Sequence, residues 1–162
     1  MVYPETERLS PNRDPGRQEA LGVVFHHSEL GFEETIALMQ RPESKVSYHG
    51  LIAPDGRRCV LVKDADVAWH AGASTFLGRT RCNDFMLGLA FAGDTRLEPL
   101  SEDQIASALE WLEARWSRHG WTLERMIDHR QASPGRKEDL APEEWTKLRA
   151  AIARPFEPLR TP

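Results

Sequence analysis

Histidine is the residue type that most clearly indicates chemistry in this chain of 162 residues. An apolar run, residues 22–27, ends in the pair His26 and His27, and a second short run ends in His129. Asp139 follows ten residues after His129, across a Pro-Gly loop that can fold back toward the histidine. Two imidazoles and one carboxylate form a hydrolytic zinc set, with a fourth position open for water. Because this spacing matches no short metal motif, satisfied structural histidines remain an alternative on spacing alone.

The neighbours of these residues narrow the ligand set. Successive strand residues face opposite sides, so only one of His26 and His27 is expected to be a ligand. Asp128 is a rival to Asp139, although its strand position next to the histidine would turn it away. Lys137 lies two residues before Asp139 and would stabilise an oxyanion if its loop reached the ligands. Otherwise Lys137 is a solvated loop lysine.

The segments that must position these residues alternate between strand and helix patterns. Strands are expected over 22–27, 85–93 and 125–129, and a hairpin over 45–64 that turns at Pro54-Asp55-Gly56. Helices are expected over 32–40, from the capping residue Ser101 with Gln104 through Trp116, and from Pro142 to about Ala153. His119 precedes a glycine and is interpreted as a cationic helix C-terminus. Residues 64–84 and 129–139 are expected to be loops.

This order predicts an α/β fold, with one domain built on a central mixed β-sheet flanked by α-helices. Residues 1–20 are expected to form an irregular arm, 21–156 the domain and 157–162 a C-terminal tail. The net charge of −4 gives no basic field for nucleic acid or an anionic membrane surface. No secretory signal or membrane span is visible, so we expect a cytoplasmic monomer with Cys59 and Cys82 as free thiols.

Five segments, taken in order, carry a family resemblance. They are VVFHHSE, VSYHGLIAPDGRRCVLVKD, AWHAG, GRTRCNDFMLGLAFAGD and DHRQASPGRKED, and they span roughly residues 20–142. Together they resemble the N-acetylmuramoyl-L-alanine amidase and peptidoglycan-recognition superfamily, most closely its cytoplasmic AmpD-type anhydro-muropeptide amidases. The resemblance implies the amidase fold, one Zn²⁺ per chain, and hydrolysis of the amide bond between N-acetylmuramic acid and L-alanine in peptidoglycan or muropeptides.

The resemblance also implies roles for individual residues. It makes His26, His129 and Asp139 the zinc ligands and Lys137 the group that stabilises the tetrahedral intermediate. Substrate-binding positions implied by the resemblance are Trp69, His70, Arg81 and His49. Arg81 would suit a carboxylate of the stem peptide, because a guanidinium binds carboxylates in a bidentate way.

One position departs from the AmpD-type pattern. The strand after RCNDF normally resembles GIELEG and carries a catalytic acid, but here it is GLAFAG, and Ala90 replaces that glutamate. Phage-lysozyme-type amidases and amidase-active recognition proteins use a tyrosine that Tyr48 matches. We therefore expect a Tyr48/Lys137 catalytic pair, with Glu29 as a weaker substitute base. A muropeptide-recycling enzyme is favoured, and the alternatives are a lytic phage or interbacterial amidase and a non-catalytic peptidoglycan-binding module.

Overall fold

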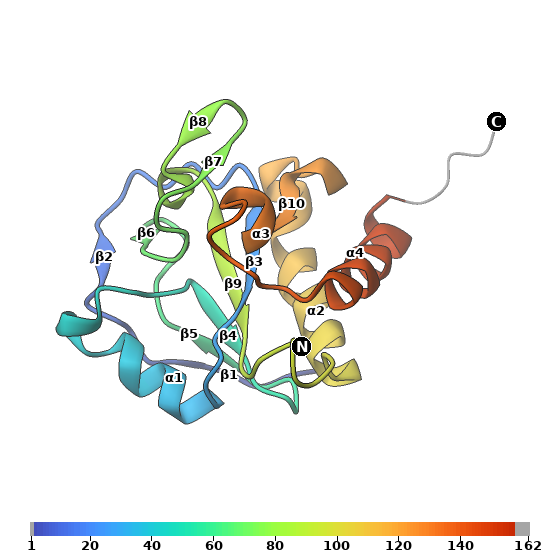
Figure 1. Ribbon diagram of the computed structural model, residues 1–162, viewed down its shortest axis with the longest axis horizontal. Coiled ribbons are helices and arrows are strands. Elements are labelled where there is room, and N and C mark those ends of the chain that lie inside the picture. Colours follow the sequence, from blue (N-terminus) through green and yellow to red (C-terminus); the bar gives the residue numbers. More distant parts are fainter. Residues whose placement is uncertain (1, 158–162) are drawn as a thin grey trace.

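A six-stranded mixed sheet forms the centre of the computed structural model, which describes residues 2–157 (Figure 1). The strand order is β1 (Glu5–Glu7), β5 (Arg58–Val60), β4 (Gly50–Ile52), β9 (Leu87–Phe91), β3 (Val23–His27) and β10 (Met126–Asp128). Strands β4, β9, β3 and β10 run parallel, while β5 is antiparallel to β4 and closes the predicted hairpin. The predicted mixed sheet is confirmed. The tail expected over 157–162 lies outside the described residues except for Glu157.

Helices cover both faces of this sheet, as Figure 1 shows. Helix α1 (Phe32–Met39) lies on one side, and α2 (Glu102–His119) and α4 (Pro142–Phe156) lie on the other. Residues Leu87, Leu89 and Phe91 of β9 pack with α2 and α4, whereas Ala90 and Ala92 pack against α1. Both faces of β9 are therefore buried, which explains its nearly continuous apolar sequence. Each fully buried leucine or phenylalanine contributes about 2 kcal/mol.

Local signals set the helix ends as the sequence predicts. Ser101 and Gln104 form the expected reciprocal capping box at the start of α2. Gly120 ends the helix with a left-handed φ of 62°, which glycine adopts without strain. His119 is the last residue of α2, as expected; burial and the neighbouring Arg118 lower its pKa, and its ring stacks on Trp121.

The first 20 residues are more ordered than the irregular arm that we expected. Strand β1 extends the sheet by pairing with β5, and β2 (Arg13–Asp14) pairs with β6 (Val67–Ala68). The Asn12 side chain is buried and donates to the carbonyls of Met39, Arg41 and Val46. The residues of β1 are exposed, so this edge strand has no apolar alternation that would reveal it.

The two predicted loops also contain short elements. Residues 64–84 hold β6, the small hairpin of β7 (Thr75–Phe76) and β8 (Arg79–Thr80), and the 3₁₀ turn Cys82–Asp84. The strand that was expected to end at His129 ends at Asp128, and His129 begins the one-turn helix α3 (His129–Ala132). Further 3₁₀ turns lie at Pro42–Ser44 and Leu123–Arg125. Cys59 and Cys82 are free and buried. No helix within residues 2–157 is long and apolar enough to cross a membrane.

Candidate metal centre

The carboxyl ends of β3 and β10 carry the two histidines that approach one another. Strand alternation places His26 and His27 on opposite sides, as predicted, and only the His26 ring faces His129. The Nδ1 atoms of His26 and His129 lie 3.0 Å apart. Because β3 and β10 are parallel neighbours in register, their ends deliver both rings to one edge of the sheet.

Asp139 completes this group from the loop that follows α3. Its Oδ1 lies 3.3 Å from Nδ1 of His129, and its Oδ2 lies 3.5 Å from Nδ1 of His26. The three side chains are buried. Burial alone would raise the pKa of Asp139, but the facing His129 and His26 rings outweigh it and hold that pKa well below its usual range. Burial, and then repulsion from His129, lowers the pKa of His26 to about 4, so His26 is neutral at pH 7.

This donor set fits a divalent metal such as zinc. Two imidazole nitrogens and one carboxylate face a common point, and their ligand atoms lie within 4.8 Å of one another. The rival carboxylate of Asp128 is fully buried, and it accepts from the backbone N–H groups of Gln131 and Leu140 and from Arg130 Nε. Asp128 therefore caps α3 and does not face the group.

A second group of candidate ligands lies beside the first, on the opposite side of β3. It consists of His27, Glu29 and Asp94. The Arg96 guanidinium already contacts Glu29 Oε1 at 3.0 Å and Asp94 Oδ2 at 2.8 Å. The backbone N–H of Thr95 donates to His27 Nδ1 at 3.0 Å. The Arg96 guanidinium thus supplies the positive charge that balances these carboxylates. We therefore assign no metal to this group.

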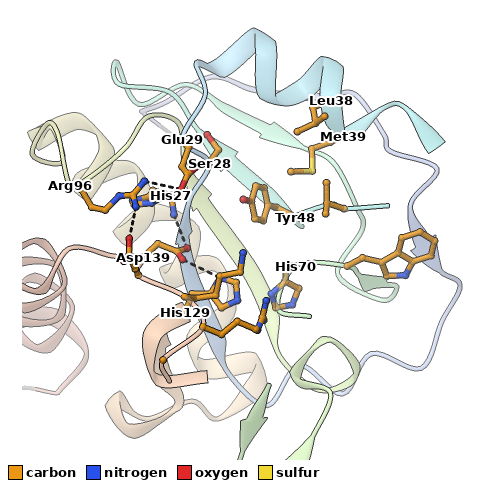
Figure 2. Close-up of a pocket in the computed structure, with 16 residues that line it drawn as sticks. His27, Ser28, Glu29, Leu38, Met39, Tyr48, His70, Arg96, His129 and Asp139 are labelled. Carbon is orange, nitrogen blue, oxygen red and sulfur yellow. Dashed lines mark hydrogen bonds and ion pairs between the residues drawn. The ribbon is translucent and has the colours of Figure 1, made fainter. Parts of the chain in front are cut away.

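His129 and Asp139 line an open cavity of about 370 Å³, and His26 lies buried directly behind them (Figure 2). One wall is largely apolar and comes from the end of α1, the segment before β4 and the residue after β6, whereas the opposite wall is charged. The apolar wall contains Leu38, Met39, Val46, Tyr48 and Trp69, and the charged wall contains Glu29, Arg96, Arg136, Lys137, Glu138 and Asp139. Figure 2 shows Tyr48, His70 and His129 pointing into this space from different elements.

Besides Glu29, the weaker candidate base, four of the predicted catalytic and substrate-binding residues line this cavity with His129 and Asp139. They are Tyr48, Trp69, His70 and Lys137. The Tyr48 ring lies 5.1 Å from the His26 ring between centroids, and Lys137 is exposed. His70 is only 7% exposed, and its Nδ1 lies 2.9 Å from His26 Nε2. The structure therefore brings these residues together around the facing ligands.

The structure does not place His49, which was expected to contact substrate, at this cavity. Its ring is 2% exposed and does not line the cavity. The Gly88 N–H donates to Nδ1 of His49, and Nε2 of His49 donates to the Asp66 carbonyl. His49 thus joins β9 to the 64–84 segment. Arg81 is 69% exposed, bonds to Asp84, and does not line this cavity either.

Arg96 and Arg136 are cavity residues that the sequence did not reveal. Arg96 bridges Glu29, Asp94 and Glu138, and so ties the end of β3 to the loop that carries Lys137. Nη2 of Arg136 donates to the Ala71 carbonyl at 2.6 Å and to the Ala73 carbonyl at 3.0 Å. Apart from Asp94, these partners are distant in sequence, so no local pattern predicts the contacts.

Comparison with known proteins places the chain in a family. The family profile described as N-acetylmuramoyl-L-alanine amidase matches residues 16–142. The chain belongs to the N-acetylmuramoyl-L-alanine amidase family. It is 37% identical over 98 residues to the 1,6-anhydro-N-acetylmuramyl-L-alanine amidase AmpD of Haemophilus influenzae, covering 60% of this chain and 53% of that protein.

Further members of the amidase family agree with this assignment. AmpD of Salmonella typhimurium is 35% identical over 112 residues, which cover 67% of this chain and 58% of that protein. The chain thus spans little more than half the length of the curated relatives it matches. A crystal structure of an AmpD selenomethionine derivative superimposes with a TM-score of 0.80 at 27% identity, covering 94% of this chain and 96% of that one.

Proposed function

We propose that this chain is a zinc-dependent amidase that hydrolyses the bond between N-acetylmuramic acid and L-alanine in 1,6-anhydro-muropeptides, as a cell-wall recycling enzyme. The observation that carries the proposal is the convergence of His26, His129 and Asp139, of which His129 and Asp139 line the same cavity as Lys137 and Tyr48. The family assignment and the activity named for the AmpD relatives support the substrate class.

His26, His129 and Asp139 would hold the zinc ion, leaving the cavity side open to water and substrate. A bound zinc ion would lower the pKa of water toward neutrality and polarise the amide carbonyl. The three residues suit this role because His26 is neutral and Asp139 is ionised at pH 7, which are the forms that bind metal.

Lys137 and Tyr48 supply the remaining polar groups of the proposed reaction. The ammonium of Lys137 lines the cavity two residues from Asp139, where it would stabilise the negative charge that develops on the carbonyl oxygen. Burial, and then the charges of Asp139 and Glu29, raises the pKa of Tyr48 well above its usual range. The phenol therefore stays protonated at neutral pH, and it would orient water and donate a hydrogen bond rather than act as a free base.

Because residue 90 is alanine, β9 carries no counterpart of the catalytic acid in the AmpD-type pattern. Ala90 pairs in register with His26, is fully buried, and packs in the apolar cluster with Leu51 and Ile36. Glu29 lines the cavity, but its carboxylate is paired with Arg96. We therefore assign proton handling to Tyr48 and Lys137. The absence of an acid at position 90 also favours a second candidate function, a zinc-bearing muropeptide binder without turnover.

The proposed substrate would lie along the two unlike walls of the cavity. Trp69 lies on the apolar wall with Nε1 donating to Asp14, which leaves its ring face to pack against the sugar or the lactyl group. A stem-peptide carboxylate could reach Arg81 only if the peptide extended beyond the cavity, because Arg81 lies outside its lining.

The decisive experiment joins metal analysis to mass spectrometry of two digests. Purified protein would be assayed for zinc and incubated with soluble anhydro-muropeptides and, separately, with intact sacculi. We expect one zinc per chain and release of L-alanine-terminated peptide, faster from the soluble substrate. Zinc binding without release would support the binder, preferential release from sacculi would support a lytic amidase, and a protein that binds no zinc would refute the proposal.

Lys137→Ala tests the assigned oxyanion role, with Lys63→Ala as the matched control. Lys63 is also an exposed lysine, and within residues 2–157 it forms one ion pair, with Glu7 at 4.0 Å. We expect Lys137→Ala to keep zinc and lose about 100-fold or more in kcat, while Lys63→Ala behaves as the parent. Parent turnover in Lys137→Ala would show that another group stabilises the oxyanion.

A further inference from the structure

We propose that two consecutive groups of the 68–72 segment, the His70 ring and the Ala71 carbonyl, fix the tautomers of the two histidine ligands. His70 is then a positioning residue for His26, and the Ala71 carbonyl does the same for His129. The inference rests on the proposed metal site, but it concerns how this chain prepares that site.

The first chain of hydrogen bonds begins at a backbone carbonyl. Nε2 of His70 lies 3.0 Å from the Met86 carbonyl, and a carbonyl can only accept, so this nitrogen carries the proton. A neutral imidazole has one donor and one acceptor, which leaves Nδ1 of His70 as an acceptor. Nε2 of His26 lies 2.9 Å from that atom and must donate. Nδ1 of His26 is therefore left unprotonated, facing Asp139 and His129.

The second chain is shorter and reaches the same result. Nε2 of His129 lies 3.1 Å from the Ala71 carbonyl and donates to it. Nδ1 of His129 is then the lone-pair nitrogen, 3.0 Å from Nδ1 of His26. Two unprotonated nitrogens cannot hydrogen-bond to each other, because neither carries a hydrogen. Their facing lone pairs suit a cation held between them.

The 68–72 segment is held firmly enough to perform this task. Oδ1 of Asn83 accepts the backbone N–H groups of His70 at 3.0 Å and of Ala71 at 2.7 Å. Nη2 of Arg136 also donates to the Ala71 carbonyl, at 2.6 Å. Gly88 on β9 leaves the space for the ring, since a Cβ there would lie 2.5 Å from Cγ of His70. The ring is therefore confined by neighbours on several sides.

These contacts reassign His70 from substrate binding to ligand positioning. Both of its ring nitrogens are engaged within the protein, and the residue is 7% exposed. It offers the cavity an edge of the ring but no available polar atom. Removal of a hydrogen-bond partner behind a metal ligand typically weakens metal binding about 10–100-fold.

The test compares His70→Leu with His70→Gln by competition for zinc against a chromophoric chelator. Leucine removes the acceptor for His26, whereas the glutamine amide can accept from His26 and donate to the Met86 carbonyl. We expect a zinc dissociation constant about 10–100-fold higher for His70→Leu and near the parent value for His70→Gln. His119→Leu, which removes a histidine at the end of α2 whose ring stacks on Trp121, is the matched control and should keep parental zinc affinity.

Correlation of the histidine ring nitrogens and protons by NMR tests the parent protein directly and needs no variant to fold. His26, His70 and His129 are each expected to carry the proton on Nε2 in the zinc-loaded protein. A proton on Nδ1 of His70 would overturn the proposal, and so would parental zinc affinity in His70→Leu with only a raised KM. A parent that binds no zinc would instead refute the proposed function, while the ring-proton positions in that protein would still test the hydrogen-bond chains.

Discussion

Gly88→Ala isolates the packing that holds His70 against His26, one of the proposed metal ligands. The added Cβ would lie 2.5 Å from Cγ, 2.7 Å from Nδ1 and 2.9 Å from Cβ of His70. These are atoms at the base of a buried ring, and its backbone N–H is bonded to Asn83, so the ring cannot withdraw without breaking contacts. The ring must shift away from β9, and the 2.9 Å hydrogen bond to His26 is the contact it loses.

Two effects of this substitution can be measured separately. Overpacking of a filled interior costs about 1–3 kcal/mol in the free energy of unfolding of the metal-free protein. Loss of the bond to His26 should weaken zinc binding about 10–100-fold. That loss corresponds to about 1.4–2.7 kcal/mol at 25 °C, because each tenfold change is about 1.4 kcal/mol. The zinc-loaded protein should therefore be destabilised more than the metal-free protein.

Gly50→Ala is the matched control for this prediction. Gly50 lies on the adjacent strand β4, opposite Leu89, and a Cβ there would lie 2.9 Å from Cδ1 of Leu89 and 3.4 Å from Nε1 of Trp111. The strain caused by this Cβ falls on the face of the sheet opposite to His70. Urea unfolding with and without zinc, together with chelator competition, measures both variants. If Gly88→Ala loses no more zinc affinity than Gly50→Ala, the reasoning about His70 is refuted.

Three further predictions concern the cleft and the buried histidines. Tyr48→Phe keeps the ring beside His26, so zinc affinity should hold while kcat falls about 100-fold or more; parental kcat would remove the hydroxyl from the mechanism. Glu138→Gln removes the negative charge from the 2.5 Å contact with Arg96 and weakens it, so steady-state kinetics should show a lower kcat with unchanged unfolding, because the loop carrying Lys137 is loosened. Burial lowers the pKa of His49 from 6.5 to about 4, so the unfolded chain binds its proton first as the pH falls. Metal-free protein should lose about 3 kcal/mol of stability from this residue between about pH 6.5 and pH 4, and His49→Gln should flatten that part of the unfolding profile.

The local elements were predictable because their signals lie within a few residues. The capping pair Ser101 and Gln104, the turn at 54–56 and the apolar run 22–27 each specify a structure through neighbouring backbone and side chains. The same applies to the opposite orientations of His26 and His27, which follow from strand alternation alone. The family motifs then identified which histidines and which aspartate to expect in one place.

Contacts between distant segments were decided only by the tertiary structure. Strand β1 is an exposed edge strand without apolar alternation, so its pairing with β5 depends on the open edge that β5 offers. His49 and His70 appear alike in sequence, near strand ends and glycines, yet one joins backbone groups and the other stands behind His26. Their difference is set by which backbone carbonyls and ring nitrogens lie within about 3 Å after folding.

The sequence by itself predicted the sheet and helix pattern, the family, and the three residues that we propose hold a metal: His26, His129 and Asp139. Only the tertiary structure decided that the His70 ring and the Ala71 carbonyl contact those histidines. Hydrogen bonds act over a few ångströms, whereas these partners are separated by tens of residues along the chain. It also showed that Ala90 is a packed core position, in register with His26, rather than an empty place for a missing acid.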